Sequence, residues 1–312
     1  MSASERLRRI QVMASSRLHF GLLSFGHSQR RQFGGVGVMI QQPTCKLYFT
    51  SSSSFDVAGK LSNRVLAFVH HWTQWHGHSE LPLCRIEVES VAREHVGLGV
   101  GTQLGLSVAS GLNRLSGRPE VPITELVQSV GRGARSAVGS YGFLSGGLIV
   151  DAGKTDAEQI SPLEARLPVP ASWRWVLICP QQGSGLSGES EGQAFEQLPP
   201  VSEAVSERLE NEIQEEILPA VREHQFERFA QAVFRFGERA GSCFATVQGG
   251  SYHGQELIQR SSCEVFECSF GFQISEIVLP LCDPSVDINF CWFAFRHEVA
   301  DPFQLGLRVY QS

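Results

Sequence analysis

The stretch Gly97-Leu98-Gly99-Val100-Gly101-Thr102-Gln103 sets three glycines at alternate positions, and Leu104–Leu115 follows with the apolar spacing of a helix. Glycine lets the backbone turn tightly and approach a ligand closely. The first N–H groups of a helix carry a partial positive charge and lack partners, so a phosphate or diphosphate binds there without a lysine. Thr102 either caps this helix or directs its hydroxyl to a phosphate or a magnesium shell. The loop is therefore a candidate anion site, although glycines before a helix also serve close packing alone.

Two common phosphate-binding motifs do not fit this loop. A P-loop requires Gly-Lys-Ser/Thr, which does not follow here. A dinucleotide-binding fingerprint needs a strand directly before the loop and a βαβ unit around it. The nearest strand, expected at 84–91, is separated from the loop. The identity of the anion therefore depends on the wider sequence context.

The flanking pattern favours α+β layering with an antiparallel or mixed sheet, because strands and helices interleave without regular βαβ spacing. The boundary between two domains is expected between residues 168 and 169, within the proline-rich LPVPAS. Periodicity predicts strands at 44–50, 84–91, 146–151 and 173–179, and helices at 60–76, 104–115, 122–135 and 202–240, the last broken at Pro219.

Bulk composition describes an ordinary globular protein. The 312 residues are 42% hydrophobic and 19% charged, with a formal net charge of -6. This balance disfavours a nucleic-acid-binding surface. No apolar run resembles a signal peptide or a membrane span, so a cytoplasmic protein without membrane contact is expected, with its eight cysteines as reduced thiols.

Four further blocks give the loop a family context. GLGVGTQLGLS, residues 97–107, resembles the central glycine-rich motif of the GHMP kinase superfamily. The chain is similar to β-ribofuranosylaminobenzene 5′-phosphate synthases, a branch of that superfamily, in four blocks that occur in the same order. These blocks are residues 15–43, 131–153, 184–195 and 244–254.

The resemblance implies a GHMP-type two-domain α+β fold. Residues 1–168 would form a domain like ribosomal protein S5 domain 2, and residues 169–312 a ferredoxin-like domain. It also implies a reaction in which 4-hydroxybenzoate or 4-aminobenzoate condenses with phosphoribosyl diphosphate to a C-riboside 5′-phosphate, CO2 and diphosphate. The reaction belongs to tetrahydromethanopterin biosynthesis and so to one-carbon metabolism; Mg²⁺ is expected and ATP is not. A homodimer is the common expectation for such an enzyme.

The resemblance also assigns candidate site residues. The cationic ribosyl transition state favours a nearby carboxylate, and the benzoate favours a guanidinium. Candidate catalytic residues are Arg17, His19, Glu94 and Asp151. Candidate substrate- or phosphate-binding residues are Gly97, Gly99, Gly101, Thr102, Gln103, Arg132, Arg135, Ser136, Gly185 and Gly188.

Some of these residues have plainer interpretations. His19 is either a hydrogen-bond donor to substrate or a satisfied histidine in a buried strand, and Asp151 either acts on the substrate or binds backbone. Gly34–Gly37 either brings backbone close to a ligand or forms a hairpin turn. No metal-ligating residues are expected. His70, His71, His76 and His78 are poorly spaced for a shared metal, and Cys263, Cys268, Cys282 and Cys291 do not have zinc-knuckle spacing.

Two alternative functions stay open. An ATP-dependent GHMP small-molecule kinase shares the glycine-rich loop, but Ser136-Ala137-Val138-Gly139 stands where such kinases with a catalytic Asp carry Ser-Gly-Ile-Asp. A non-catalytic paralogue would bind a phosphate ligand without turnover. The tail after about residue 260 is atypical, because the late motif Gly-Gln-Ser-Ser-Trp-Gly-Pro-Thr of the synthases is missing, and a frameshift would explain it.

Overall fold

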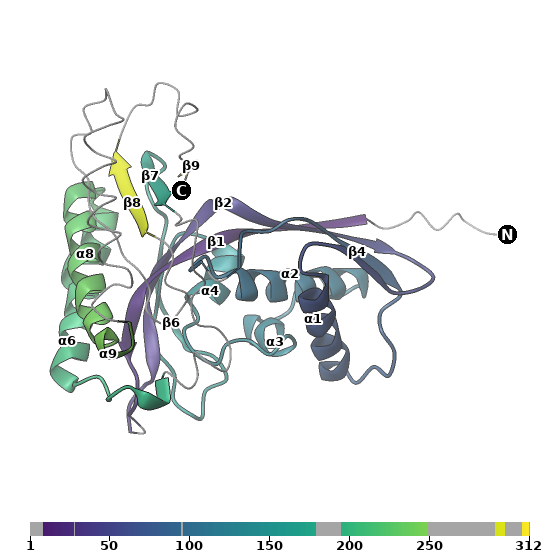
Figure 1. Ribbon diagram of the computed structural model, residues 1–312, viewed down its shortest axis with the longest axis horizontal. Coiled ribbons are helices and arrows are strands. Elements are labelled where there is room, and N and C mark those ends of the chain that lie inside the picture. The colour runs from purple at the N-terminus through teal and green to yellow at the C-terminus, as the bar shows by residue number, and fades with distance from the viewer. Residues whose placement is uncertain are drawn as a thin grey trace.

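The computed structural model describes residues 9–27, 29–94, 96–178, 195–248, 291–296 and 308–311. Two long strands, β1 (Arg9–Ser24) and β2 (Phe33–Ser51), run through most of the molecule, from helices α6 and α8 at one end to α1 and β4 at the other (Figure 1). None of the helices in these ranges combines the length and the apolar character needed to cross a bilayer.

The main sheet of the described chain has six strands and is mixed. β1 and β2 pair antiparallel, and the other edge of β2 pairs with both β4 and β5. β3 lies parallel to β4, while β6 lies antiparallel to β5. The remaining strands of this sheet are β3 (Asp56–Gly59), β4 (Cys84–Ser90), β5 (Leu148–Asp151) and β6 (Leu163–Leu167). The expected α+β layering with a mixed sheet is confirmed.

One hydrophobic core lies between the β4 end of this sheet and helices α1 (Ser62–Trp75) and α2 (Val100–Leu115). In β4, Ile86 and Val88 face this core and the intervening residues are exposed, as the alternating sequence predicts. α3 (Ile123–Gln128) closes the same core. α2 therefore packs against the sheet along most of its length, and this packing fixes the position of the loop at its start.

A second core joins the other end of β1 to α8 (Phe226–Ser242) and β7 (Trp173–Ile178). The ring of Phe229 lies 6.2 Å from that of Phe20 in β1 and 4.7 Å from that of Trp173 in β7. β7 pairs with β8 (Cys291–Arg296) and β9 (Arg308–Gln311) in a second sheet. The boundary expected between residues 168 and 169 falls in the link from β6 to β7, and the division into two domains stays a prediction.

Two helix predictions were wrong, one at its C-terminal end and one in an internal break. The helix expected at 122–135 stops at Gln128, because Gly131 and Gly133 adopt φ values of 63° and 85° that end a helix. The break expected at Pro219 does not occur. The chain continues from α6 (Glu203–Asn211) through the π-helical η1 (Glu212–Ile217) into α7 (Leu218–Arg222).

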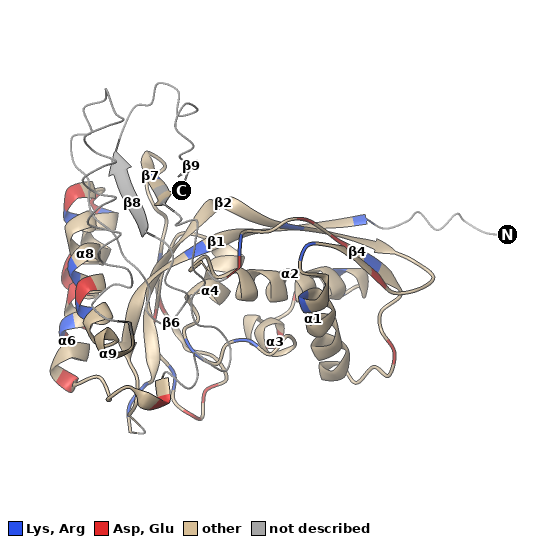
Figure 2. Ribbon diagram, in the orientation of Figure 1, with Lys and Arg blue, Asp and Glu red and all other residues tan. Residues whose placement is uncertain are grey.

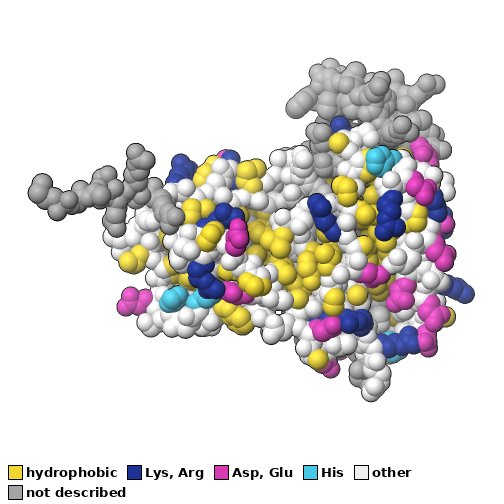
Figure 3. Space-filling model, turned by 180° about the vertical axis from the view of Figure 1, so that it is seen from behind, with side chains coloured by type: hydrophobic (Ala, Val, Ile, Leu, Met, Phe, Trp, Pro, Cys, Tyr) yellow, Lys and Arg dark blue, Asp and Glu magenta, His cyan; other side chains and the backbone are white. Residues whose placement is uncertain are grey.

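Pro219 is tolerated because it lies in the first turn of α7, where a backbone N–H is dispensable, and a π-helical turn precedes it. The helical run turns instead at His224, whose φ is 57°. Charges of both signs follow α6 and α8 (Figure 2), and pairs such as Arg235 with Glu212, 2.6 Å apart, join η1 to α8. From behind, apolar side chains gather across the middle of the molecule between charged groups of both signs (Figure 3).

Candidate active site at the start of helix α2

The glycine-rich loop forms the start of α2. Gly99 is the N-cap residue, with a left-handed φ of 67°, and no side chain caps the helix. The N–H groups of Thr102 and Gln103 both reach the carbonyl oxygen of Gly99, each over 3.1 Å. The suggestion that Thr102 caps the helix is therefore wrong, because the N-cap lies three residues earlier, at Gly99. Gly97, Gly99, Gly101 and Thr102 are all partly exposed, as a ligand-binding loop requires.

Three guanidinium groups converge on this helix start from β1, from α1 and from the loop between α3 and α4. Arg17 in β1 is 6% exposed, and a Cβ built on Gly99 would lie 3.1 Å from its Cβ. Nη2 of Arg132 donates to Thr102 Oγ1 over 3.2 Å. Nη2 of Arg64, in the first turn of α1, lies where a Cβ on Gly101 would be. Together with the α2 N-terminus they form a compact site of positive charge.

Glu94 lies beside this site and is engaged with Arg64. Arg64 Nη1 donates to Glu94 Oε1 in a close ion pair, and the side chains are 33% and 24% exposed. The structure thus brings Glu94 close to the glycine-rich loop. Its catalytic role stays a prediction.

A second cluster centres on His19 of β1. Ser136 Oγ donates to Asp151 Oδ2 over 2.7 Å, since an ionised carboxylate only accepts. The single hydroxyl proton is then used, so Ser136 accepts from His19 Nε2, 2.9 Å away. His19 Nδ1 accepts the N–H of Gly21 over 3.3 Å. These partners fix the His19 tautomer with its proton on Nε2.

Asp151 anchors this cluster. It is fully buried and accepts four hydrogen bonds, two at each carboxylate oxygen. At Oδ2 the donors are Ser136 and the N–H of Ala137, the latter 2.9 Å away. At Oδ1 they are Ser161 and the N–H of Gly153, the latter 3.2 Å away. This arrangement favours the interpretation in which Asp151 binds backbone and holds Ser136 and His19 in place.

Gly34–Gly37 belongs to β2 and is not a hairpin turn, so that interpretation was wrong. The His19 ring lies over Gly35, where an added Cβ would come within 2.9 Å of His19 Cε1. An added Cβ on Gly37 would overlap the carbonyl oxygen of Leu18. These glycines let β2 approach β1 closely enough to seat the His19 ring.

The segment that replaces the kinase Asp joins the two clusters. The Gly139 carbonyl oxygen accepts from Gln103 Nε2 over 2.9 Å. A Cβ on Gly139 would lie 3.4 Å from Arg17 Cδ and 3.5 Å from Thr102 Cγ2. Position 139, at the start of α4 (Val138–Ser145), therefore faces the glycine-rich loop without offering a carboxylate.

Curated proteins named beta-ribofuranosylphenol 5'-phosphate synthase match the chain over most of its length. The protein from Archaeoglobus fulgidus is 30% identical over 243 residues, which cover 73% of this chain and 75% of the relative. This chain belongs to the beta-ribofuranosylphenol 5'-phosphate synthase family. The relative from Methanothermobacter thermautotrophicus is 29% identical over 259 residues, 76% of this chain and 77% of its own. The expected family, and with it a pentosyltransferase-type enzyme, is confirmed. No protein-family model matches the chain.

Solved structures show that this synthase-family chain has the GHMP kinase fold. Mevalonate pyrophosphate decarboxylase from Streptococcus pyogenes has a TM-score of 0.68 at 10% identity, with 99% of this chain and 98% of that chain covered. Mevalonate kinase from Methanococcus jannaschii has a TM-score of 0.63 at 8% identity, with 98% of each chain covered. At such identities the likeness concerns the fold alone, and the expected GHMP-type fold is confirmed.

Other candidate residues of the synthase-family chain lie elsewhere. The Arg135 guanidinium stacks on the Phe195 ring, 5.0 Å from its centroid. Gly185 and Gly188 lie outside the described residues, as do most of the atypical tail and much of blocks 184–195 and 244–254. The family blocks did not include Arg64, and no periodicity distinguishes it from other helical residues of α1. Its importance follows only from the fold.

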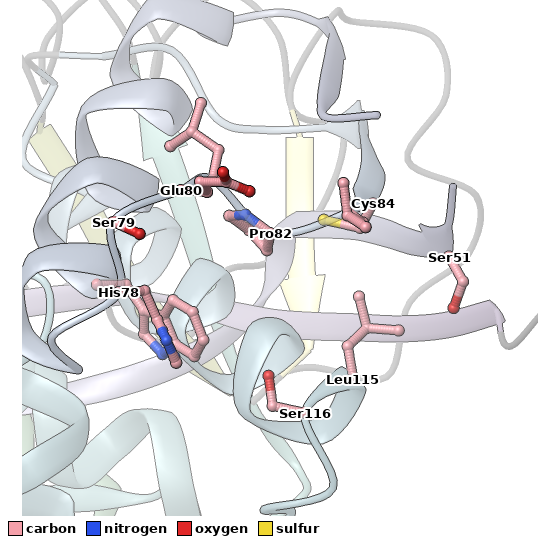
Figure 4. Close-up of a pocket in the computed structure, with 11 residues that line it drawn as sticks. Ser51, His78, Ser79, Glu80, Pro82, Cys84, Leu115 and Ser116 are labelled. Atoms are coloured by element: carbon pink, nitrogen blue, oxygen red, sulfur yellow. The ribbon is translucent and has the colours of Figure 1, made fainter. Parts of the chain in front are cut away.

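A separate cavity of about 410 Å³ lies at the opposite end of α2 (Figure 4). Burial raises the pKa of the Cys84 thiol in its wall to about 11, so this thiol stays protonated and unreactive at neutral pH. None of the candidate site residues lines this cavity. Its walls are formed by Ser51, Trp72, His78, Ser79, Glu80, Leu81, Pro82, Leu83, Cys84, Leu115 and Ser116.

Proposed function

We propose that this protein joins 4-hydroxybenzoate to phosphoribosyl diphosphate and releases CO2 and diphosphate. The observation that carries the proposal is the group of three arginines around a lysine-free glycine loop, with glycine at position 139. Such a site suits a leaving diphosphate, and position 139 offers no carboxylate that could deprotonate an alcohol. The relatives' name refers to a phenol, which favours the 4-hydroxy acid over 4-aminobenzoate as acceptor.

The proposed reaction forms one bond and breaks two. The ring carbon that bears the carboxylate attacks ribose C1, and the C1–O bond to diphosphate breaks with its electron pair leaving on diphosphate. The bond from the ring to the carboxylate then breaks, CO2 departs, and that electron pair restores the aromatic ring. Negative charge grows on the diphosphate, where the α2 N-terminus and the guanidinium groups are already oriented to stabilise it.

In this proposal Arg17 binds the aromatic acid and His19 has a structural role. Residues 17 and 19 lie on the same face of β1, because side chains alternate along a strand. Arg17, next to Gly99 and Gly139, is placed to receive the carboxylate of the aromatic acid. His19 is held by Ser136 and Gly21, so its role is to fix the local strand geometry. Holding both substrates in line can supply roughly 7 kcal/mol or more.

The residues at the loop fit Mg²⁺ only in part. No group of three His, Cys, Asp or Glu side chains in the described chain is arranged to hold a metal ion. Two side-chain oxygens at the loop are Thr102 Oγ1, which accepts from Arg132, and Glu94 Oε1, which pairs with Arg64. Mg²⁺ commonly binds through substrate phosphates with one or two protein oxygens. Here it would supply charge neutralisation at the diphosphate and would be held mainly by the substrate's own phosphates, because Arg132 and Arg64 already engage Thr102 and Glu94.

The test is diphosphate release from purified protein with Mg²⁺, phosphoribosyl diphosphate and 4-hydroxybenzoate, without ATP. The proposal predicts release that requires both substrates, with 4-aminobenzoate as a weaker acceptor. Release without any aromatic acid would indicate simple hydrolysis and contradict the transferase. ATP consumption with a small alcohol would instead support the kinase alternative, and ligand binding without turnover would support the non-catalytic one. The biosynthetic pathway, the cytoplasmic location and the homodimer remain expectations.

A further inference from the structure

The charges around the start of α2 are arranged unfavourably for a protein without a ligand. The N-terminus of a helix carries a partial positive charge and is stabilised by acidic side chains. The first turn of α2 contains no acidic residue, and guanidinium groups lie against it instead. Like charges placed together in this way lower stability unless an anion binds between them.

Arg64 is the guanidinium most directly placed over the loop. Its backbone N–H bonds the Leu61 carbonyl oxygen over 2.9 Å, which fixes it in the first turn of α1. Nη1 is occupied by Glu94, while Nη2 lies against the backbone of Gly101. The side chain is 33% exposed, so it is accessible to a ligand. A Cβ at position 101 would overlap Nη2, so a larger residue there would displace the guanidinium from this position.

We propose that Arg64 binds the diphosphate of the substrate and that Glu94 is a positioning residue that holds Arg64 in place. This inference rests on the proposed function. Before the substrate binds, the Glu94 carboxylate offsets the repulsion between Arg64 and the helix end. When diphosphate binds, Nη2 donates to it while Nη1 stays on Glu94. Glu94 therefore acts through Arg64, in place of acting directly on the ribosyl cation.

The first experiment measures binding of inorganic diphosphate by titration calorimetry. Arg64→Ala should weaken binding about 10- to 100-fold, the range for losing a charge-assisted hydrogen bond. Arg64→Lys keeps the charge without the planar fork and should recover part of the affinity. Glu94→Gln should weaken binding by a smaller factor. Arg114→Ala, at the exposed C-terminal end of the same helix, removes the same charge and should leave the affinity unchanged.

A double-mutant cycle on turnover tests the link between the two residues. If Glu94 acts only through Arg64, adding Glu94→Gln to Arg64→Ala leaves kcat and KM as they are in Arg64→Ala. A further fall in kcat in that background would overturn the positioning role. Unchanged diphosphate affinity in Arg64→Ala, with active wild-type protein, would overturn the inference and leave the proposed function standing. Wild-type protein that neither binds diphosphate nor turns over would overturn both.

Discussion

Replacing Asp151 by Asn removes one of two acceptor oxygens from a fully buried carboxylate. Each oxygen receives one backbone N–H and one serine hydroxyl. The new amide group must face one of these two pairs. A serine hydroxyl can rotate and accept from the amide, but the backbone N–H of Ala137 or Gly153 cannot. Whichever way the side chain turns, one backbone N–H therefore loses its acceptor.

The loss of stability can be estimated from the hydrogen bond that is lost and the backbone N–H that is left without an acceptor. A hydrogen bond to a charged group is worth about 1.5–3 kcal/mol, and an orphaned buried donor adds about 1–3 kcal/mol. Asp151→Asn should therefore lower the free energy of unfolding by about 3–5 kcal/mol. The amide can face Ser161 and Gly153, which leaves Ser136 and His19 bonded as before. Folded Asp151→Asn protein should thus keep most of its kcat.

Urea unfolding followed by fluorescence measures the stability, and turnover per folded molecule measures the activity. Asp156→Asn is the matched control, because Asp156 is exposed and only five residues away; its unfolding free energy should change by no more than about 0.5 kcal/mol. The reasoning is refuted if Asp151→Asn unfolds at the wild-type urea concentration while its kcat collapses. That result would assign the carboxylate to the chemistry.

Three more predictions concern the loop, a thiol and the second core. Gly99→Ala and Gly117→Ala should each cost about 1–2 kcal/mol of unfolding free energy, because both glycines have left-handed φ values of 67° and 78°. Only Gly99→Ala should also weaken diphosphate binding in calorimetry, since nothing lies within 4 Å of an added Cβ on Gly117. Burial raises the pKa of the Cys45 thiol to about 12 from 9.0, so the unfolded chain loses this proton first. The stability that the neutral thiol contributes is complete below pH 9 and is lost as the pH rises towards 12, by up to about 1.4 kcal/mol per pH unit. Urea unfolding at several pH values in this range should therefore show that the free energy of unfolding falls less steeply with pH for Cys45→Ala than for the wild type. Phe229→Ala should lower the free energy of unfolding by about 3–5 kcal/mol in the same assay, because its buried ring contacts both β1 and β7.

Local periodicity was enough to predict α1, α2 and β4, but it did not predict β1, which carries Arg17 and His19. The apolar spacing at 60–76 and the alternation at 84–91 correspond to α1 and β4 because each has one buried face. The glycine-rich loop was recognised because its glycines meet a local backbone requirement, the left-handed turn at Gly99. Where a residue's conformation is set by its neighbours in sequence, the sequence alone is informative.

Features that depend on distant contacts could not be predicted in this way. Arg64 reaches Glu94 and Gly101 only because α1 packs beside α2, and no local pattern marks that contact. The His19, Ser136 and Asp151 cluster needs the register of β1, β2 and β5, which sequence spacing does not reveal. The helix end at Gln128 did have a local signal, namely the two glycines at 131 and 133. The prediction gave more weight to the helical periodicity than to these glycines and therefore extended the helix too far.

The central claim is that this site performs a decarboxylating ribosyl transfer. The most direct measurement incubates the purified protein with Mg²⁺, phosphoribosyl diphosphate and carboxyl-labelled 4-hydroxybenzoate, without ATP, and collects labelled CO2. The account predicts CO2 release that requires phosphoribosyl diphosphate and equals the diphosphate formed. Folded protein that binds diphosphate but releases no labelled CO2 from either 4-hydroxybenzoate or 4-aminobenzoate would contradict it.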